Sequence, residues 1–343
     1  MVEYIKKLIR GEHLTGEEAF DAMKLIMQGE AGEISTAGFL VALAIKGVTS
    51  EEIESFSKAM RSAAERWPDS NQMDIVDTCG TGGDSASLLN VSTITAFVIA
   101  SMGYHVAKHG NRAVSSPTGS ADVLEELGVR IGTNPDESIA LLKEIGICFL
   151  FAPNWHPAME FAAPVRRVLS LQAVFNILGP ITNPAPITHQ LMGVYDKRFL
   201  KPIAGALAGL GRRRALVVHS HDGLDEISIQ LPTDYIKIVD GRVESEGIFY
   251  PKDFGIEPTD MKTLKVENRQ ASAKRVEQIL KGMGTEVENR MVSVNAAAVL
   301  TLFNDHLSLA DAYQEVVDHL KSGKAYSTLE RWRSYSLQPI HRV

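Results

Sequence analysis

Short apolar segments alternate with longer apolar segments along most of the chain after residue 73. The short segments fit buried strands, because polar or glycine-rich residues bound them, and the longer ones fit helices. Strands that alternate with helices in this way form a mainly parallel sheet. The predicted strands are residues 74–77, 105–107, 147–151, 190–195 and 215–219, followed by antiparallel strands in 235–250 and by helices in the C-terminal part.

The beginning of the chain predicts helices without strands. At Thr15 and again at Thr49, a Glu follows the Thr by three residues, and this spacing is typical of a capping box at a helix start. Residues 37–45 are apolar enough for a packed helix, and the polar run 67–71 predicts a linker. A helical region therefore precedes the sheet.

A chain of 343 residues with 45% hydrophobic content buries a large core and fits two domains. We predict an α/β fold with a small N-terminal helical domain in residues 1–70 and a large α/β domain in residues 71–343. The large domain has a mainly parallel central sheet with helices on both faces.

Charge and cysteine usage exclude several classes of protein. The chain has 35 basic and 42 acidic residues, a net charge of -7, and it lacks a basic run, so we expect no nucleic-acid partner. No apolar run is long enough to span a membrane, and the basic residues before Gly11 are not followed by the apolar core of a signal peptide, so we expect no membrane partner and a cytoplasmic protein. Cys79 and Cys148 have no metal-binding spacing, and we expect no disulfide between them.

Three glycines within four residues, Gly80, Gly82 and Gly83, follow the first predicted strand. Bare backbone N–H groups at such a loop approach a ligand closely, and the helix N-terminus behind them favours phosphate. The same glycines also fit a tight strand-to-helix turn that needs only positive φ, and from this loop alone both interpretations stay open. The loop matches neither the dinucleotide-binding fingerprint nor the P-loop pattern, which disfavours a Rossmann dehydrogenase and a P-loop NTPase.

A second polar segment, residues 108–122, follows after one predicted helix and one strand. A right-handed strand–helix–strand unit places this segment and the glycine loop at the same carboxyl edge of a parallel sheet. Lys108 and Arg112 supply positive charge, and several hydroxyl side chains supply donors that suit a phosphorylated sugar. Each hydroxyl alone fits a turn or a cap equally well, so the prediction depends on their density.

Acidic residues gather in a third segment, residues 222–226, after the predicted strand 215–219. Adjacent acids at a strand end are often a solvated loop. Beside a phosphate-binding loop they have a better explanation, because Mg²⁺ is commonly shared between one or two carboxylates and substrate phosphates. The sequence therefore predicts a magnesium site.

These motifs together resemble the anthranilate phosphoribosyltransferase family. The resemblance runs from the N-terminal helices to residues 322–325 and covers essentially the whole chain. The related pyrimidine nucleoside phosphorylases lack the forms seen at residues 108–112 and 222–226. The motifs that carry the resemblance are residues 80–84, 90–93, 108–112, 119–122, 156–159, 175–180 and 222–226.

The resemblance implies Mg²⁺-dependent transfer of a phosphoribosyl group from 5-phosphoribosyl 1-diphosphate to the amine of anthranilate, in L-tryptophan biosynthesis. It also implies a homodimer formed through the helical domain, which residues 164–190 complete. The positions that match the family's donor site are Gly80, Gly83, Asp84, Asn90, Val91, Ser92, Thr93, Lys108, His109, Gly110, Asn111, Ser115, Ser116 and Ser120.

Smaller sets match the other sites of the family. The metal ligands implied are Ser92, Asp225 and Glu226. The anthranilate contacts implied are Gly80, Asn111 and Arg166, with His109, His156 and Pro180 along the route by which the aromatic acid reaches them. A guanidinium such as that of Arg166 can clamp a carboxylate with two hydrogen bonds, although without the family a solvated helix arginine is the simpler interpretation.

The chemistry of the implied reactants requires no strong general acid or base, because the aromatic amine is unprotonated at neutral pH. We expect catalysis by positioning and electrostatics, with Lys108 and Asp84 as charged contributors, and we expect His109 and His156 to shape the acceptor route. The chain departs from the family pattern at Ser85, Leu88, Gln172 and Ala173, among other positions. A paralogue with another aromatic acceptor, a pyrimidine nucleoside phosphorylase and a binding protein without activity remain alternatives.

Overall fold

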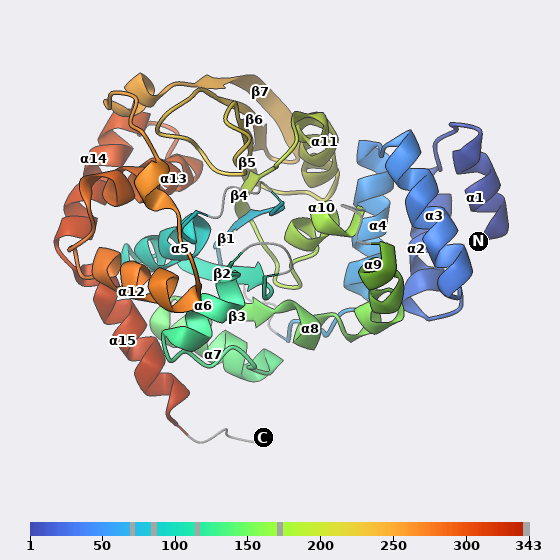
Figure 1. Ribbon diagram of the computed structural model, residues 1–343, viewed down its shortest axis with the longest axis horizontal. Coiled ribbons are helices and arrows are strands. Elements are labelled where there is room, and N and C mark those ends of the chain that lie inside the picture. Colours follow the sequence, from blue (N-terminus) through green and yellow to red (C-terminus); the bar gives the residue numbers. More distant parts are fainter. Residues whose placement is uncertain (69–72, 84–87, 114–116, 170–173, 339–343) are drawn as a thin grey trace.

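The computed structural model describes residues 1–68, 73–83, 88–113, 117–169 and 174–338. Four helices come first, and strands and helices then alternate (Figure 1). The first helices are α1 (Val2–Ile9), α2 (Gly16–Met27), α3 (Glu33–Lys46) and α4 (Ser50–Ser62). The strands are β1 (Ile75–Gly80), β2 (His105–Gly110), β3 (Ile147–Phe151), β4 (His189–Gly193), β5 (Arg214–Ser220), β6 (Thr233–Val239) and β7 (Arg242–Phe249).

The remaining helices connect the strands or follow them. Short 3₁₀ segments lie at Pro157–Phe161, Lys197–Phe199, Pro251–Phe254 and Lys262–Leu264. The α-helices are α5 (Val91–Ser101), α6 (Ser120–Glu126), α7 (Pro135–Ile145), α8 (Ala152–Trp155), α9 (Ala163–Leu169), α10 (Val174–Ile181), α11 (Leu200–Gly209), α12 (Arg269–Leu280), α13 (Glu286–Phe303), α14 (Leu309–Lys321) and α15 (Lys324–Ser336).

One seven-stranded sheet organises the described part of the chain, in the order β3-β2-β1-β4-β5-β6-β7. The first five strands in this order are parallel, and β6 and β7 pair antiparallel, as the sequence predicted. The strand order reverses at β1, because β2 and β3 lie to one side of it and β4 and β5 to the other. Ligands of open α/β sheets bind at such a switch point, outside the carboxyl ends of the strands.

Alternate residues of the parallel strands are buried against helices on opposite faces. In β5, Leu216 and Val218 belong to the core that includes α5 and α13, whereas Ala215 and Val217 belong to the core that includes α4 and α11. Strands buried on both faces are apolar throughout, which explains the continuous hydrophobic pattern in the sequence. The predicted arrangement of helices on both faces of the sheet is confirmed.

Both predicted capping boxes begin helices in the N-terminal group. Thr15 and Thr49 each accept a hydrogen bond from the backbone N–H of the Glu three residues later, at the starts of α2 and α4. Glu52 is fully buried and is bound by the ammonium of Lys46 with an Nζ–Oε1 distance of 2.6 Å, so this helix start is held by an ion pair as well. Helices α9 and α10 return from the later part of the chain and pack on α3 and α4.

Strands β1 and β2 extend further toward the loops than the sequence suggested, whereas β4 ends at Gly193, two residues before its predicted end. Strand β1 continues to Gly80 and β2 continues to Gly110, so Lys108 and His109 belong to a strand. Their polar side chains did not end the strand, because backbone carbonyl groups nearby accept hydrogen bonds from them. Of the predicted linker, residues 67 and 68 are described, and Trp67 stacks on Trp155 with ring centroids 5.8 Å apart.

Candidate active site

The glycine loop and the acidic segment meet directly at the end of β1. The backbone N–H of Gly82 donates to Oδ2 of Asp225 at 2.7 Å. Gly82 and Gly83 have φ values of +64° and +86°, which favour glycine. A Cβ added at Gly80 would overlap the Asp225 carboxylate, and one at Gly193 would overlap the Asp225 backbone. The missing side chains therefore allow the acidic segment to lie against the ends of β1 and β4.

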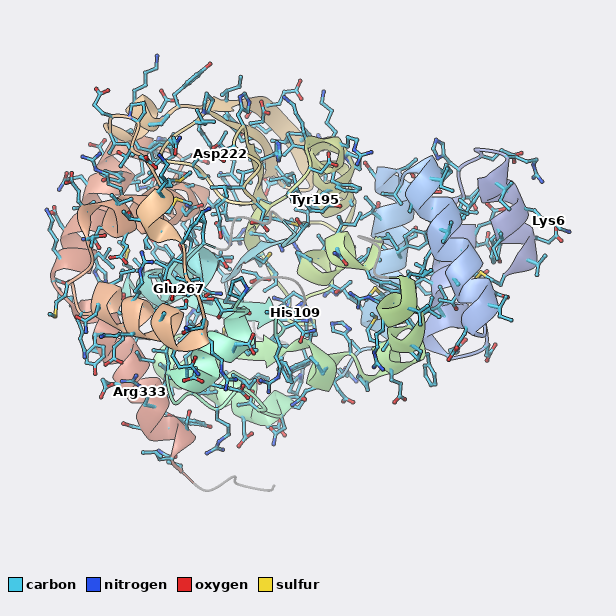
Figure 2. The ribbon with its side chains drawn as sticks, in the orientation of Figure 1. Lys6, His109, Tyr195, Asp222, Glu267 and Arg333 are labelled. Carbon is cyan, nitrogen blue, oxygen red and sulfur yellow. The ribbon has the colours of Figure 1, made fainter. Side chains whose placement is uncertain are left out.

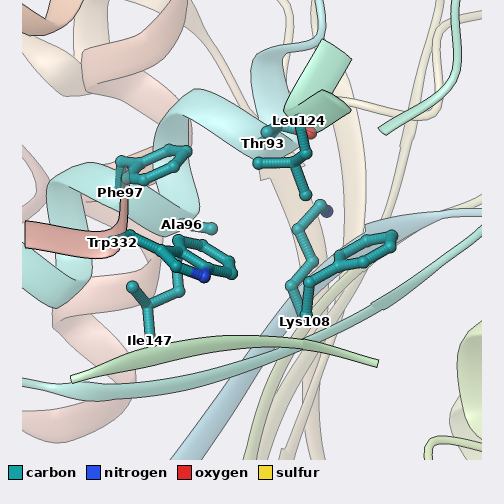
Figure 3. Close-up of a pocket in the computed structure, with 8 residues that line it drawn as sticks. Thr93, Ala96, Phe97, Lys108, Leu124, Ile147 and Trp332 are labelled. Carbon is teal, nitrogen blue, oxygen red and sulfur yellow. The ribbon is translucent and has the colours of Figure 1, made fainter. Parts of the chain in front are cut away.

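Lys108 places a buried cation beside the same loop. Its side chain donates from Nζ to the carbonyl of Thr78 at 2.5 Å and to Oγ of Ser92 at 3.1 Å. Thr78 in turn donates to the Ser92 carbonyl from its hydroxyl. Figure 3 shows the Lys108 side chain running from its strand toward Thr93 and Leu124. The cation thus joins the end of β1 to the start of α5.

Four residues predicted to bind 5-phosphoribosyl 1-diphosphate lie at the start of α5: Asn90, Val91, Ser92 and Thr93. Asn90 is the N-cap residue, and its Oδ1 accepts from the hydroxyl of Ser272 at 2.8 Å. Val91 and Thr93 are buried, and the Thr93 hydroxyl has no hydrogen-bond partner within the described ranges. The N–H groups of Val91 and Thr93 donate to the carbonyls of Leu89 and Asn90, at 2.7 and 3.0 Å. The positive end of the α5 dipole, next to Lys108, still favours an anion such as phosphate.

The second predicted segment turns around Asn111. Its carbonyl accepts from the backbone N–H of Ala121 at 3.2 Å and from Oγ of Ser120 at 3.4 Å. A Cβ added at Gly110 would overlap that hydroxyl, so Gly110, Asn111 and Ser120 lie close together. Arg112 differs from the expectation that it supplies charge to a phosphate, because its guanidinium is paired with Glu125 and lies over the Phe151 ring.

His109 and His156 form a buried pair, and Figure 2 shows His109 on the side of the sheet that faces the N-terminal helices. Their ring centroids are 5.2 Å apart. Nδ1 of His109 lies 3.0 Å from the carbonyl of Gly179, and His156 hydrogen-bonds the backbone of Thr182. The Nε2 atoms of both rings are buried and have no partner within the described part of the chain. Two neutral imidazoles thus present acceptor atoms.

Burial lowers the pKa of His109 to about 3 and that of His156 to about 4. Both rings are neutral across the physiological range, and neither has a pKa suited to proton transfer near neutral pH. This agrees with the expectation that the two side chains shape a binding route.

Helix α10 is docked between β4 and α4 through its last carbonyl groups. The Pro180 carbonyl accepts from Nε2 of Gln190 at 2.9 Å, and the Ile181 carbonyl accepts from Oγ of Ser57 at 3.2 Å. These carbonyls would otherwise lack partners at a helix end. Pro180 is buried in this contact, which fixes the wall next to His109.

Four buried polar side chains near this contact, Asp77, Asn183, Gln190 and Arg212, were not predicted as site residues. Asn183 donates from Nδ2 to Oδ2 of Asp77 at 2.9 Å, and Arg212 donates from Nε to Oε1 of Gln190 at 3.0 Å. Burial raises the pKa of Asp77 and lowers that of Arg212 to about 10. Asp77 and Gln190 lie at the ends of predicted strands, where a polar residue also fits a loop, so the sequence carried only a weak signal.

Arg166 lies on α9 over the ring of Phe175, with its Cζ 5.2 Å from the ring centroid. Burial lowers the pKa of its guanidinium. Both residues belong to the segment between β3 and β4 that returns to the N-terminal helices. A partly buried guanidinium held by an aromatic face suits a planar carboxylate.

Several predicted residues lie outside the described ranges, so their place in the site is not given. They are Asp84, Ser115 and Ser116 from the donor set, and Ser85, Gln172 and Ala173 from the departures. Leu88 is described: it pairs with Lys265 in an isolated antiparallel bridge and packs against the sheet core. Its side chain therefore has an apolar role.

The two histidines predict a pH-dependent stability. The ordinary pKa of histidine is 6.5, so below this pH both imidazoles are protonated in the unfolded chain but stay neutral in the folded chain. The free energy of unfolding should fall with acidification from about pH 6.5 to pH 4, with a slope of up to about 1.4 kcal/mol per pH unit for each ring. Urea unfolding at a series of pH values measures this slope in wild type and in the double variant His109→Gln with His156→Gln. The free energy of unfolding of the double variant should depend less on pH than that of wild type, whereas the exposed control His306→Gln should match wild type. Equal slopes in wild type and the double variant would contradict the assignment.

Comparison with known proteins defines the class. The chain matches the model of the glycosyl transferase family helical bundle domain over residues 2–64 and that of the family's a/b domain over residues 72–326. It is therefore a member of a glycosyl transferase family with a helical bundle and an α/β domain. Within the described ranges, none of the helices is both long and apolar enough to cross a membrane.

Relatives that are similar over nearly the whole chain identify the enzyme family within this class. Anthranilate phosphoribosyltransferase from Methanobrevibacter smithii is 42% identical over 97% of this chain and 98% of the relative. The enzyme of that name from Thermus thermophilus has a crystal structure with a TM-score of 0.91, 37% identity and coverage of 98% and 99%. The Saccharomyces cerevisiae enzyme in complex with PRPP and Mg has a TM-score of 0.89 and 25% identity, with coverage of 98% and 97%. The chain belongs to the anthranilate phosphoribosyltransferase family and is an enzyme of that family, which confirms the resemblance.

Proposed function

We propose that the protein transfers the phosphoribosyl group of 5-phosphoribosyl 1-diphosphate to the amine of anthranilate, with Mg²⁺ as cofactor, in L-tryptophan biosynthesis in the cytoplasm. The observation that carries the proposal is the meeting of the glycine loop, Lys108 and Asp225 at the end of β1. Paired carboxylates next to a diphosphate would repel it. A metal ion bound between them removes this repulsion, which is how Mg²⁺ is commonly shared between carboxylates and substrate phosphates. The yeast enzyme's complex with PRPP and Mg supports the same assignment.

The donor would lie between the glycine loop and the start of α5. Backbone N–H groups of the glycine loop and the positive N-terminal end of α5 would bind phosphate oxygens, with the Lys108 ammonium beside them. Ser120 and Asn111 would contact the donor from the second segment. Of the proposed donor residues, Asp84, Ser115 and Ser116 rest on the family match alone.

The residues present fit a magnesium ion. Asp225 and Glu226 are adjacent carboxylates on a segment that lies against Gly80, where a Cβ would overlap the Asp225 carboxylate. Hard oxygen donors of this kind are those that Mg²⁺ prefers, and Ser92 would add a hydroxyl oxygen. When bound, the ion neutralises negative charge that develops on the departing diphosphate.

The acceptor would lie between Arg166, Asn111 and the histidine pair. The Arg166 guanidinium would bind the carboxylate of anthranilate, and the neutral Nε2 atoms of His109 and His156 would accept hydrogen bonds along the route of access, with Pro180 in its wall. The bond between C1 and the diphosphate oxygen breaks, the amine nitrogen bonds C1, and the amine then loses a proton to water. Positioning of the two substrates is enough for catalysis, because the amine nitrogen of anthranilate is unprotonated and its lone pair can attack C1 without a general base.

We further propose a homodimer formed through the helical domain, residues 1–70 with about 164–190. Helix α3 packs between α1 and α9, at the end of the molecule away from the sheet (Figure 1). Ile34 and Ile45 of α3 are 91% and 83% exposed, and Val168 of α9 is exposed as well. The two isoleucines lie eleven residues apart and thus on one face of the helix. An exposed apolar stripe of this kind fits a second copy.

Charged residues on that stripe should separate the copies. Ile34→Glu with Ile45→Glu is expected to convert a dimer to a monomer, because a buried unpaired carboxylate opposes association. Size-exclusion chromatography with light scattering gives the mass directly. Met283→Glu, at an exposed apolar position outside the helical group, should leave the mass unchanged. A wild-type monomer, or a dimer that survives the double substitution, would contradict this interface.

One assay tests the proposed reaction. Anthranilate fluorescence should decrease with time only when the diphosphate donor and Mg²⁺ are both present, and one diphosphate should be released for each anthranilate consumed. Fluorescence that stays constant, together with turnover of another aromatic amine, would favour the paralogue. Phosphate-dependent cleavage of thymidine would favour a pyrimidine nucleoside phosphorylase. No turnover in any of these assays would favour a binding protein.

A further inference from the structure

Asn295 is a fully buried polar side chain in the middle of α13, among apolar residues. Its Oδ1 accepts from the backbone N–H of Ile227 at 2.9 Å. Its Nδ2 donates to the carbonyl of Ile227 at 3.1 Å and to the carbonyl of Met291 at 2.9 Å. One side chain thus binds both backbone polar groups of Ile227, as a neighbouring strand would.

Ile227 follows Glu226 directly, so this contact holds the acidic segment from its C-terminal side. Two other contacts also hold the segment: Asp222 accepts from the Ser228 hydroxyl at 2.6 Å, and the Leu224 carbonyl accepts from the Ser220 N–H at 3.1 Å. Both join the segment to residues that immediately precede or follow it in the sequence. Asn295 is the contact among them that comes from a helix on the face of the sheet.

The acidic segment, residues 222–226, directly contacts the glycine loop and β4. Asp225 binds the Gly82 N–H, and its backbone passes so close to Gly193 that a Cβ there would overlap it. A rigid-body displacement of the segment toward β4 is therefore blocked. A displacement away from β4 is opposed by the hydrogen bonds of Asn295, because it would leave two buried backbone groups of Ile227 unpaired.

We propose that Asn295 is a positioning residue that sets the distance of Asp225 and Glu226 from the glycine loop and thereby the affinity of the site for Mg²⁺ and diphosphate together. This rests on the proposed function. Residues that orient metal ligands from behind commonly change metal affinity by about 10- to 100-fold when replaced. Asn295 acts through Ile227 and touches neither substrate nor reacting atoms.

The test compares Asn295→Ala and Asn295→Asp with Ser293→Ala. Ser293 is equally buried on the same helix, and its hydroxyl has no partner within the described residues, so it controls for a small cavity in α13. Two quantities are measured on the full chain: calorimetric binding of inorganic diphosphate at a series of Mg²⁺ concentrations, and the Mg²⁺ concentration that gives half-maximal turnover. Urea unfolding gives the stability of each variant.

Both Asn295 variants should need roughly tenfold or more Mg²⁺ for half-maximal diphosphate binding and turnover. Ser293→Ala should match wild type in both, and the KM for anthranilate at saturating Mg²⁺ should be the same in all variants. Variants that lose stability with unchanged Mg²⁺ dependence, or that do not fold in either form, would assign Asn295 to the core alone and overturn the proposal. A wild-type protein without Mg²⁺-dependent diphosphate binding would overturn the proposed metal site itself.

Discussion

The double substitution Asp225→Asn with Glu226→Gln is expected to reduce turnover to background while the protein stays folded. It removes the two carboxylates proposed as metal ligands, and a metal that stabilises the charge on a leaving group contributes several kcal/mol, or about a hundredfold to a thousandfold in rate or more. The fold should survive, because the amide oxygen of Asn can still accept from the Gly82 N–H.

The measurement is kcat from anthranilate fluorescence at increasing Mg²⁺, together with circular dichroism and unfolding of the same preparation. Glu244→Gln with Glu246→Gln is the matched control, because it removes the same two charges from exposed positions on β7. That control should keep wild-type turnover. Full activity in the Asp225 and Glu226 variant would remove both residues from the metal site.

Features that depend on neighbouring residues in the sequence were predicted well. The capping boxes at Thr15 and Thr49 need only four residues to be recognised, and both begin helices as predicted. The buried strands showed as short apolar runs, because each packs against helices on both faces. The strand–helix–strand rule then brought Gly80 and Lys108 to one edge, where the structure has them.

Contacts between distant segments were beyond such reasoning. Arg112 was predicted to supply positive charge, but Glu125 on the following helix, α6, pairs with it. The hydrogen bonds of Asn183 to Asp77 and of Asn295 to Ile227 join segments 106 and 68 positions apart. No local pattern marks such a pair, because each partner alone fits a loop or helix position equally well.

The neutral histidine pair needed the structure for the same reason. From the sequence, His109 and His156 were single residues for which a structural role was as good an interpretation as a functional one. The carbonyl of Gly179 and the backbone of Thr182 hold the two rings, and both partners come from the region of α10. Only this arrangement leaves the two Nε2 atoms buried together, and only burial makes both rings neutral.

Arg166→Ala is expected to raise the KM for anthranilate by roughly tenfold to a hundredfold, since a lost hydrogen-bonded carboxylate contact costs about 1.5–3 kcal/mol. The KM for the diphosphate donor should change little, because Arg166 lies on α9 beside Phe175 and not at the glycine loop. Arg166→Lys should fall between wild type and the Ala variant, since lysine keeps the charge but lacks the planar fork that binds a carboxylate twice.

Arg167→Ala provides the control, because Arg167 is the next residue on α9 and its side chain is exposed. Initial rates with each substrate varied in turn separate the two KM values. A rise in the donor KM alone would place Arg166 at a phosphate. A proportional loss of kcat with both KM values unchanged would mean that Arg166 acts on the transition state, and the carboxylate of the acceptor would then need another partner.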